Sequence, residues 1–332
     1  MRDRNLLGPW IKRFLLEYLV AERNLARNTQ FSYRDTLTLL LPFAGHSART
    51  AIDRLSVEDI SPDTVRMFLK SLECERGCSI ATRNQRLSAI HSLARFIGTR
   101  SPEHLAWCTE VRSIPFKKAA KTVIGYLEKP EMQALLRAPN QSMALGARDY
   151  GLLLFLYNSG ARADEAAGLC VSNLQLGTSA YVRILGKGNK WRVCPLWSVT
   201  VAALQPLVAG RAHEDHVFRG RTGEPMTRFG VHRLVTHYAA AAAQRVESMR
   251  DKHISPHTIR HTTAVHLLRA GVDINTIRAW LGHVSLDTTH IYAEVDLEMK
   301  AKALASVDIS NLPQGLHRQP PSPSLMEFMR RL

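Results

Sequence analysis

The sequence predicts a mainly α-helical protein with a small β-sheet, an α+β fold divided into two domains. Apolar residues recur at helical spacing along most of the chain. One pair of short β-rich runs flanks a glycine-containing turn. The chain has 332 residues, more than one typical domain, and 45% of them are hydrophobic. This composition is enough for a buried core in each half and excludes wholesale disorder.

The N-terminal third is predicted to be a bundle of four or five short helices. An apolar stripe runs from Phe14 to Leu19, and a second helix follows Asn28, which is a suitable N-cap. Ser61 opens a third helix, with a proline directly after the cap. A fourth helix covers residues 80–97 and carries arginines among its apolar positions.

The rest of the chain is predicted to be mixed. A hairpin joins runs at residues 180–185 and 191–196 through a five-residue turn that contains glycine. Helical patterns cover residues 130–138, 144–158, 162–169, 198–209, 228–248, 256–270 and 274–281.

These patterns divide the chain into a helical domain at residues 1–110, a linker at 111–125, a mixed domain at 126–310 and a tail at 311–332. The linker contains a proline, has no acidic residue and shows no periodicity. Its basic residues are Arg112, Lys117, Lys118 and Lys121. A cationic linker of this kind is suited to lying along a phosphate backbone, and a solvated loop is the alternative.

The charge favours a polyanionic partner. The chain has 44 Lys+Arg against 29 Asp+Glu, a net charge of +15, and such a surplus most often serves nucleic acid, with a merely basic enzyme as the alternative. The longest strongly apolar run, residues 152–157, is too short to span a bilayer, and no secretory signal is evident. Five cysteines without metal-type spacing suit a reducing compartment. We therefore expect a cytoplasmic, nucleoid-associated protein.

Two segments of the mixed domain place arginine where a helix begins. Gly160 can end one helix in the left-handed conformation, so Arg162 lies at the start of the next, where unpaired N–H groups favour an anion. Glu165, three residues on, could pair with that arginine and hold its fork in place. An ordinary surface ion pair is the alternative.

The second segment begins with a serine cap and a proline. His257 and Arg260 then share one face of the helix and would form a site for an anion and a proton. His257 and His261 also have the i, i+4 spacing of metal ligands, but Arg260 would repel a cation and the Glu of a HExxH motif is absent. We therefore predict no metal site.

Three further residues are ordinary when taken alone. Lys187 lies at the hairpin tip, where most lysines are merely solvated. His283 follows a probable glycine helix terminator, and Tyr292 lies near the end of a short helix, where a packing role is usual.

Together, the residues form an ordered set. In sequence it reads Arg162, Lys187, His257, Arg260, His283 and Tyr292, with Leu-Gly-His nine residues before the tyrosine. This set strongly resembles the tyrosine recombinase (phage integrase) family. The resemblance covers nearly the whole chain up to the tyrosine. It implies a helical, SAM-like core-DNA-binding domain followed by a tyrosine-recombinase catalytic domain.

The resemblance also assigns roles. Tyr292 would attack a DNA phosphodiester to give a 3′-phosphotyrosine and a free 5′-hydroxyl, while Lys187 would protonate the leaving 5′-oxygen and His257 would assist proton transfer at the tyrosine. Arg162 and Arg260 would clamp the non-bridging oxygens, and His283 would hydrogen-bond the phosphate. Glu165 would support the first arginine. Two guanidinium forks can stabilise the charge of phosphoryl transfer without a metal, so no cofactor is expected. The covalent intermediate conserves the bond energy, so religation needs no ATP.

The resemblance implies duplex DNA as the partner and a homotetramer, or a heterotetramer with a related recombinase, that exchanges strands through a Holliday junction. We predict DNA contacts from Arg83, Arg86, Lys117, Lys118 and Lys121. A mobile-element integrase is the first interpretation and an Xer-type dimer resolvase the second. A type IB topoisomerase-like enzyme that relaxes DNA, and a DNA-binding accessory protein with idle cleavage machinery, remain as alternatives.

Overall fold

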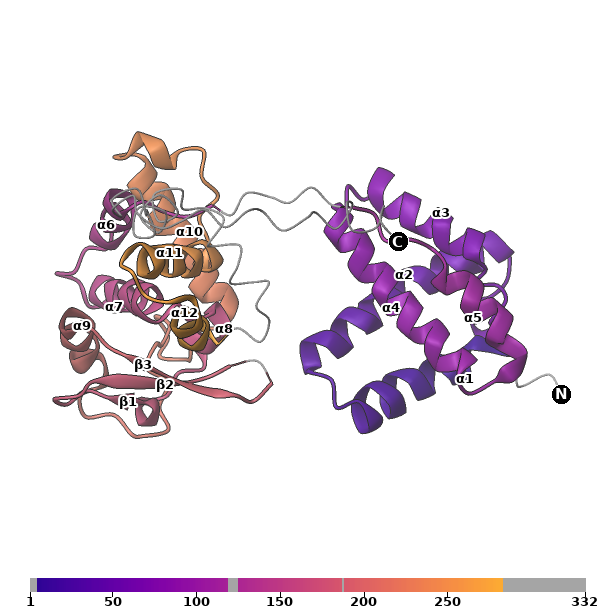
Figure 1. Ribbon diagram of the computed structural model, residues 1–332, viewed down its shortest axis with the longest axis horizontal. Coiled ribbons are helices and arrows are strands. Elements are labelled where there is room, and N and C mark those ends of the chain that lie inside the picture. The colour runs from indigo at the N-terminus through magenta and orange to yellow at the C-terminus, as the bar shows by residue number, and fades with distance from the viewer. Residues whose placement is uncertain (1–4, 119–124, 187, 283–332) are drawn as a thin grey trace, which may run out of the picture. The chain divides into compact units, whose positions relative to one another are not determined.

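The computed structural model describes residues 5–118, 125–186 and 188–282 (Figure 1). Two compact units, Met1–Thr122 and Val123–Leu332, make up the chain. Most described residues are helical, and the three described strands form one antiparallel sheet in the order β1-β2-β3. The predicted mainly α fold with a small sheet is confirmed.

The first unit is a bundle of helices. Its described elements are α1 (Leu7–Arg13), a π-helical segment (Phe14–Glu22), α2 (Arg27–Ala48), α3 (Pro62–Cys74), α4 (Ile80–Gly98), α5 (Leu105–Arg112) and two single 3₁₀ turns, Ile52–Arg54 and Pro102–His104. Ser61 caps α3 by accepting a hydrogen bond from the Thr64 N–H, as predicted. The predicted N-cap Asn28 is wrong: Ala26 is the N-cap residue, at φ −56° and ψ 141°, and α2 begins one residue before Asn28.

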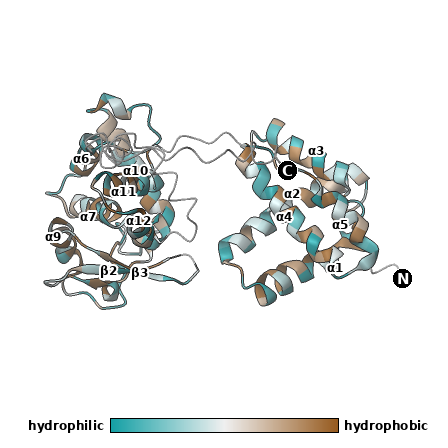
Figure 2. Ribbon diagram, viewed as in Figure 1, coloured by the Kyte–Doolittle hydropathy of each residue, from teal (hydrophilic) through white to brown (hydrophobic). Residues whose placement is uncertain are grey.

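Aromatic rings fill the centre of this bundle. Phe14 is fully buried, stacks on Tyr18 and Tyr33, and lies 5.5 Å from the ring centre of Phe96. Figure 2 shows hydrophobic and hydrophilic residues alternating along the helices, as amphipathic helices require. The first unit therefore has its own core.

The second unit combines helices with the sheet. Its described elements are α6 (Lys129–Arg137), α7 (Ala144–Ser159), α8 (Ala163–Ala167), β1 (Leu174–Gln175), β2 (Tyr181–Leu185), β3 (Trp191–Pro195), α9 (Ser198–Val208), α10 (Arg228–Ala243), α11 (Pro256–Arg269), α12 (Ile274–Leu281) and two 3₁₀ turns, Val171–Asn173 and Glu247–Met249. The apolar run at 152–156 is buried on every side of α7, which makes this helix the centre of the unit. In Figure 1 the sheet forms one layer of this unit, and α7, α11 and α12 lie together on one side of that layer.

The predicted hairpin is present as β2 and β3, with Val182 opposite Cys194 and Ile184 opposite Arg192. These four side chains face inward and are buried, whereas Trp191 and Val193 on β3 are exposed. The inward position of an arginine on a short strand is unusual and bears on the site below. Within the described ranges, no helix is long and apolar enough to cross a bilayer.

Candidate active site

Gly160 makes the turn that presents the first arginine. It ends α7 in the left-handed conformation, at φ +59°. A Cβ at this position would lie 2.4 Å from Leu281 Cδ2, so both the backbone and the packing require glycine. Two residues later, Arg162 is the N-cap residue of α8, as predicted.

Glu165 holds Arg162 in place. Its Oε2 accepts a hydrogen bond from the Arg162 backbone N–H at 2.8 Å, and its Oε1 accepts one from Arg162 Nη1 at 2.8 Å. The Glu165 side chain is 5% exposed, whereas that of Arg162 is 35% exposed. The inner carboxylate therefore anchors an arginine whose fork still reaches the surface.

A second arginine completes the carboxylate site. Arg192 of β3 donates from Nη2 to Glu165 Oε2 at 2.6 Å, and its side chain is 7% exposed. Burial alone would raise the pKa of Glu165, but the hydrogen bond and charge of Arg192, followed by the bonds from Arg162, lower this pKa to about 2. Glu165 is thus a permanent anion between two cations.

Helix α11 carries the next two predicted residues. Ser255 caps it by accepting from the Thr258 N–H, and the ring of His257 lies 4.3 Å from that of His261. Partial desolvation and the positive charges of Arg260 and Arg162 lower the pKa of His257. The lowered pKa keeps the His257 ring mainly neutral at pH 7, and both predicted arginines are close enough to contribute to this shift.

Arg260 is buried at the centre of this group, with 1% exposure. It donates from Nη1 to the Gly160 carbonyl at 2.6 Å and from Nη2 to the Leu281 carbonyl at 2.6 Å. These carbonyls belong to the turns that end α7 and α12. One guanidinium therefore ties together the two turns around which the predicted site is built.

Helix α12 ends at the second turn. Gly282 is its C-cap in the left-handed conformation, at φ +66°, so the predicted glycine terminator is confirmed. The structure thus brings together Arg162, Glu165, His257 and Arg260. The predicted residues Lys187, His283 and Tyr292 lie outside the described residues, although Gly186 and Gly282, their neighbours in the chain, are described.

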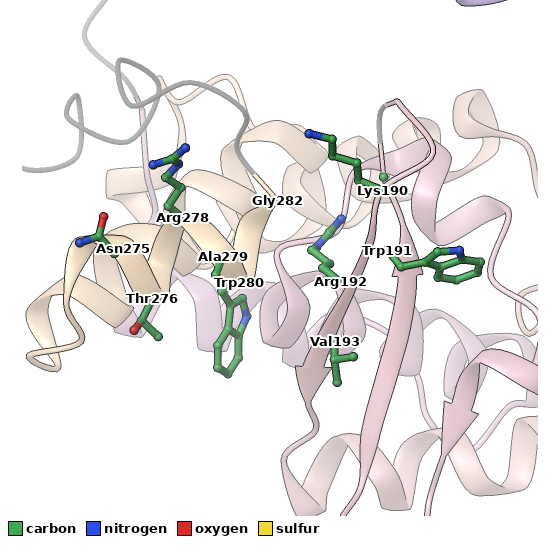
Figure 3. Close-up of a pocket in the computed structure, with 11 residues that line it drawn as sticks. Lys190, Trp191, Arg192, Val193, Asn275, Thr276, Arg278, Ala279, Trp280 and Gly282 are labelled. Atoms are coloured by element: carbon green, nitrogen blue, oxygen red, sulfur yellow. The ribbon is translucent and has the colours of Figure 1, made fainter.

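A cavity of about 650 Å³ lies between the hairpin and α12. Gly186 and Gly282 line it, together with Lys190, Arg192 and Arg278. Figure 3 shows the charged ends of these three side chains pointing to the same side, whereas the ring of Trp191 points away from them. The cavity is therefore positively charged beside both turns. Among the described residues, no three His, Cys, Asp or Glu side chains are arranged to hold a metal ion.

Arg192 is the site residue that the sequence analysis missed. Its only sequence signal is an arginine one place after Trp191 in a short β-rich run, which ordinarily indicates an exposed residue. The structure places this arginine on the inward face of β3 instead.

The predicted DNA-contacting residues of the first unit differ in their surroundings. Arg83 is 6% exposed; its Nη1 donates to the Pro115 carbonyl at 3.0 Å, and its Nε lies 3.7 Å from Glu73. Arg86 donates to the Ser32 carbonyl and to Thr36 Oγ1 on α2. Through these bonds both arginines stabilise the bundle, and their contact with DNA stays a prediction.

The linker lysines are more accessible. The backbone of Lys117 is held by the Asn84 side chain in two hydrogen bonds, while its half-exposed ammonium pairs with Glu73 at 2.6 Å. Lys118 is exposed, and Lys121 lies outside the described residues. The start of the predicted linker is therefore fixed to the first unit.

Two family models match the chain. The phage integrase family model covers residues 125–299, more than half of the chain. A second model, the phage integrase N-terminal SAM-like domain, covers residues 11–100. The two matches fall in the second and the first compact unit, respectively.

Similar curated proteins carry recombinase names. "Putative integrase/recombinase y4rC" of Sinorhizobium fredii is 37% identical over 328 residues, which are 98% of each chain. "Tyrosine recombinase XerD" of Chlorobaculum tepidum is 31% identical and covers 87% of this chain and 93% of its own length.

Solved structures share the fold. The XerH site-specific recombinase in its post-cleavage complex with palindromic difH substrate has a TM-score of 0.66 and 21% identity, covering 86% of this chain and 81% of that one. The Tn1549 transposon integrase with circular intermediate DNA has a TM-score of 0.63 and 16% identity, covering 90% and 97%. With both family models matched and relatives above 30% identity along nearly its full length, the chain belongs to the phage integrase family of tyrosine recombinases.

Proposed function

We propose that this protein is a site-specific recombinase that cleaves and rejoins duplex DNA through a covalent 3′-phosphotyrosine at Tyr292. One observation carries the proposal: two pairs of residues distant in the sequence, Arg162 with Glu165 and His257 with Arg260, lie together, and Arg260 bonds both turns that end α7 and α12. The chain's membership of the recombinase family supports it, as does the net charge of +15.

The proposed reaction is a phosphoryl transfer to tyrosine. The Tyr292 Oη attacks phosphorus, the bond from phosphorus to the 5′-oxygen breaks, and Lys187 gives a proton to that oxygen. Arg162, Arg260 and His283 stabilise the non-bridging oxygens, where charge accumulates in the transition state. Rejoining reverses these steps with a 5′-hydroxyl as the nucleophile, so the bond energy is conserved.

His257 is suited to the proton of the phenol. A tyrosine has an ordinary pKa of about 10 and is a poor nucleophile until its proton is removed. Because desolvation, followed by the charges of Arg260 and Arg162, lowers the pKa of His257 below its ordinary value, its ring is mainly neutral at pH 7 and can accept that proton. The same arginines stabilise the phenolate as it forms.

We further propose that the enzyme acts as a tetramer on two DNA sites in the cytoplasm, as part of a mobile element. The y4rC relative, which matches 98% of this chain and carries the integrase/recombinase name, supports the mobile-element role. Dimer resolution is the second candidate, because XerC and XerD proteins are also among the relatives.

The test is covalent trapping. Duplexes that bind the Tyr292→Phe chain are selected from a random-sequence pool, and a nick is then placed 3′ of the cleavage position, so that the released fragment diffuses away. We expect the wild-type chain to form a protein–DNA adduct on a denaturing gel, and Tyr292→Phe to bind with similar affinity and form none. An adduct with the phenylalanine variant would exclude Tyr292 as the nucleophile.

A further inference from the structure

Arg192 is placed where a sheet usually buries a hydrophobic side chain. It lies opposite Ile184 on the inward face of the hairpin, next to Cys194, and is 8% exposed. A buried arginine costs several kcal/mol of desolvation unless partners compensate it. Glu165 compensates it through the 2.6 Å bond to Nη2.

The rest of the guanidinium lies against two glycines. A Cβ at Gly282 would lie 3.1 Å from Arg192 Cδ and 3.3 Å from Nη1, and a Cβ at Gly186 would lie 3.3 Å from Nη1. Both glycines therefore leave room for this side chain. The Nε and Nη1 of Arg192 are buried and have no hydrogen-bond acceptor among the described residues.

These contacts connect Arg192 to both predicted arginines of the site. Glu165 is its link to Arg162, and Gly282 is adjacent to Leu281, whose carbonyl accepts from Arg260. Gly186 and Gly282 are also the residues directly before Lys187 and His283 in the chain.

We propose that Arg192 is a positioning residue: it fixes the Glu165 carboxylate, through it the fork of Arg162, and by contact the two glycine turns that precede Lys187 and His283. This inference rests on the proposed recombinase function. In this role Arg192 acts through Glu165 and the two glycines. Its effect is on the positions of the groups that contact the DNA phosphate. A displacement of about 1 Å in one of these groups can cost about 100-fold in rate.

The experiment uses the full chain and the nicked duplex described above. Single-turnover adduct formation, duplex affinity and thermal unfolding are measured for Arg192→Met, Arg192→Lys, Glu165→Gln and the double variant Arg192→Met/Glu165→Gln. Arg183→Met is the matched control, because Arg183 lies on the adjacent strand with its side chain exposed.

We expect Arg192→Met to lower the rate of adduct formation about 100-fold with duplex affinity within about threefold of wild type, and Arg183→Met to match wild type. Arg192→Lys restores part of the rate, because its ammonium can still pair with Glu165. Because Arg192 and Glu165 hold one another through their shared contact, the losses of the two single variants do not multiply, and the double variant is no slower than the slower single variant.

Two results would overturn the inference while the wild-type chain forms the adduct: an Arg192→Met rate within threefold of wild type, or single-variant losses that multiply in the double variant. Arg192→Met leaves Glu165 with one partner fewer and could fold poorly. The lysine and double variants avoid that charge imbalance. If Arg192→Met does not fold, the rates of adduct formation of these two variants are compared with wild type instead. If the wild-type chain forms no adduct, it is the proposed function that fails.

Discussion

Glu165 is a buried carboxylate whose charge is maintained by two arginines. Its pKa in the folded chain is about 2, below the ordinary 4.5. A depressed carboxylate pKa stabilises the folded state at pH values above the unfolded pKa, and this stabilisation is lost as the pH falls from there toward the folded pKa. The charge of Glu165 therefore contributes to stability as well as to the geometry of the site.

This sign gives a prediction for acid stability. When the pH is lowered from 6 to 3, the unfolding free energy of the wild-type chain should fall by about 2 kcal/mol more than that of Glu165→Gln. The reason is that the Glu165 carboxylate takes up a proton on unfolding in this range, whereas the glutamine amide does not. Urea unfolding at a series of pH values measures it. Glu247→Gln is the control, since that carboxylate is 87% exposed. Parallel curves for wild type and Glu165→Gln would contradict the prediction.

Arg260 has a structural role besides its proposed contact with phosphate. Arg260→Ala should lower the unfolding free energy by about 3 kcal/mol, because it leaves the buried carbonyls of Gly160 and Leu281 without this donor. Arg269→Ala, on the same helix but 33% exposed, should cost less than about 1 kcal/mol. Equal losses in urea unfolding would show that the two carbonyl bonds contribute little. Arg260→Lys is thus the better variant for testing catalysis.

At the scale of elements, two helix ends form the framework of the site. Helices α7 and α12 both end at glycines with positive φ, and α11 supplies the arginine that joins these ends. Left-handed residues at helix ends expose carbonyls in a fixed direction. This is why the carbonyls of Gly160 and Leu281, distant in the sequence, can share one guanidinium.

Gly160→Ala tests this framework. The change places a Cβ 2.4 Å from Leu281 Cδ2 in a left-handed conformation, and we expect a loss of about 2–3 kcal/mol in unfolding free energy. Gly271→Ala is the matched control, since Gly271 has φ +87° but nothing within 4 Å of its added Cβ. It should cost about 1 kcal/mol, the backbone share alone. A Gly160→Ala loss no larger than this would show that the contact with Leu281 is relieved without cost.

At the scale of the whole molecule, the charge is spread over both units and the linker between them. Residues 1–110 carry 16 basic and 12 acidic side chains, a net +4, and residues 126–332 carry 24 and 17, a net +7. The remaining basic residues lie in the linker. We expect duplex affinity to fall steeply with salt, because each neutralised phosphate releases a counterion.

Variants of two residues in or next to the linker distinguish a contact with DNA from a role in the stability of the first unit. Lys118→Ala should reduce the slope of log affinity against log salt by about 1, since Lys118 is exposed. Arg83→Ala should lower the melting temperature, because the Arg83 guanidinium holds Pro115 inside the first unit, and its effect on the slope tests the predicted contact of Arg83 with DNA. Titrations from 50 to 200 mM salt measure the slopes. An unchanged slope for Arg83→Ala would exclude Arg83 as a DNA contact.

The fold class, most helix positions and the caps that present the site follow from local features of the sequence. Local signals suffice for these: Ser61 and Ser255 cap the helices predicted for them, and Gly160 and Gly282 end helices as glycine permits. The order of the site residues also needed no structure, because the family resemblance depends on type and spacing. The Asn28 cap failed because an alanine can take the cap conformation too.

Which arginine is buried, and what it binds, depends on how the elements pack. The alternation along β3 suggests Trp191 and Val193 as inward residues, yet the pairing with β2 turns Arg192 and Cys194 inward. Local sequence does not encode this choice, because an isolated strand has two faces and only its partners select one. Arg260 shows the same limit, since its acceptors, Gly160 and Leu281, become neighbours only when three helices pack together.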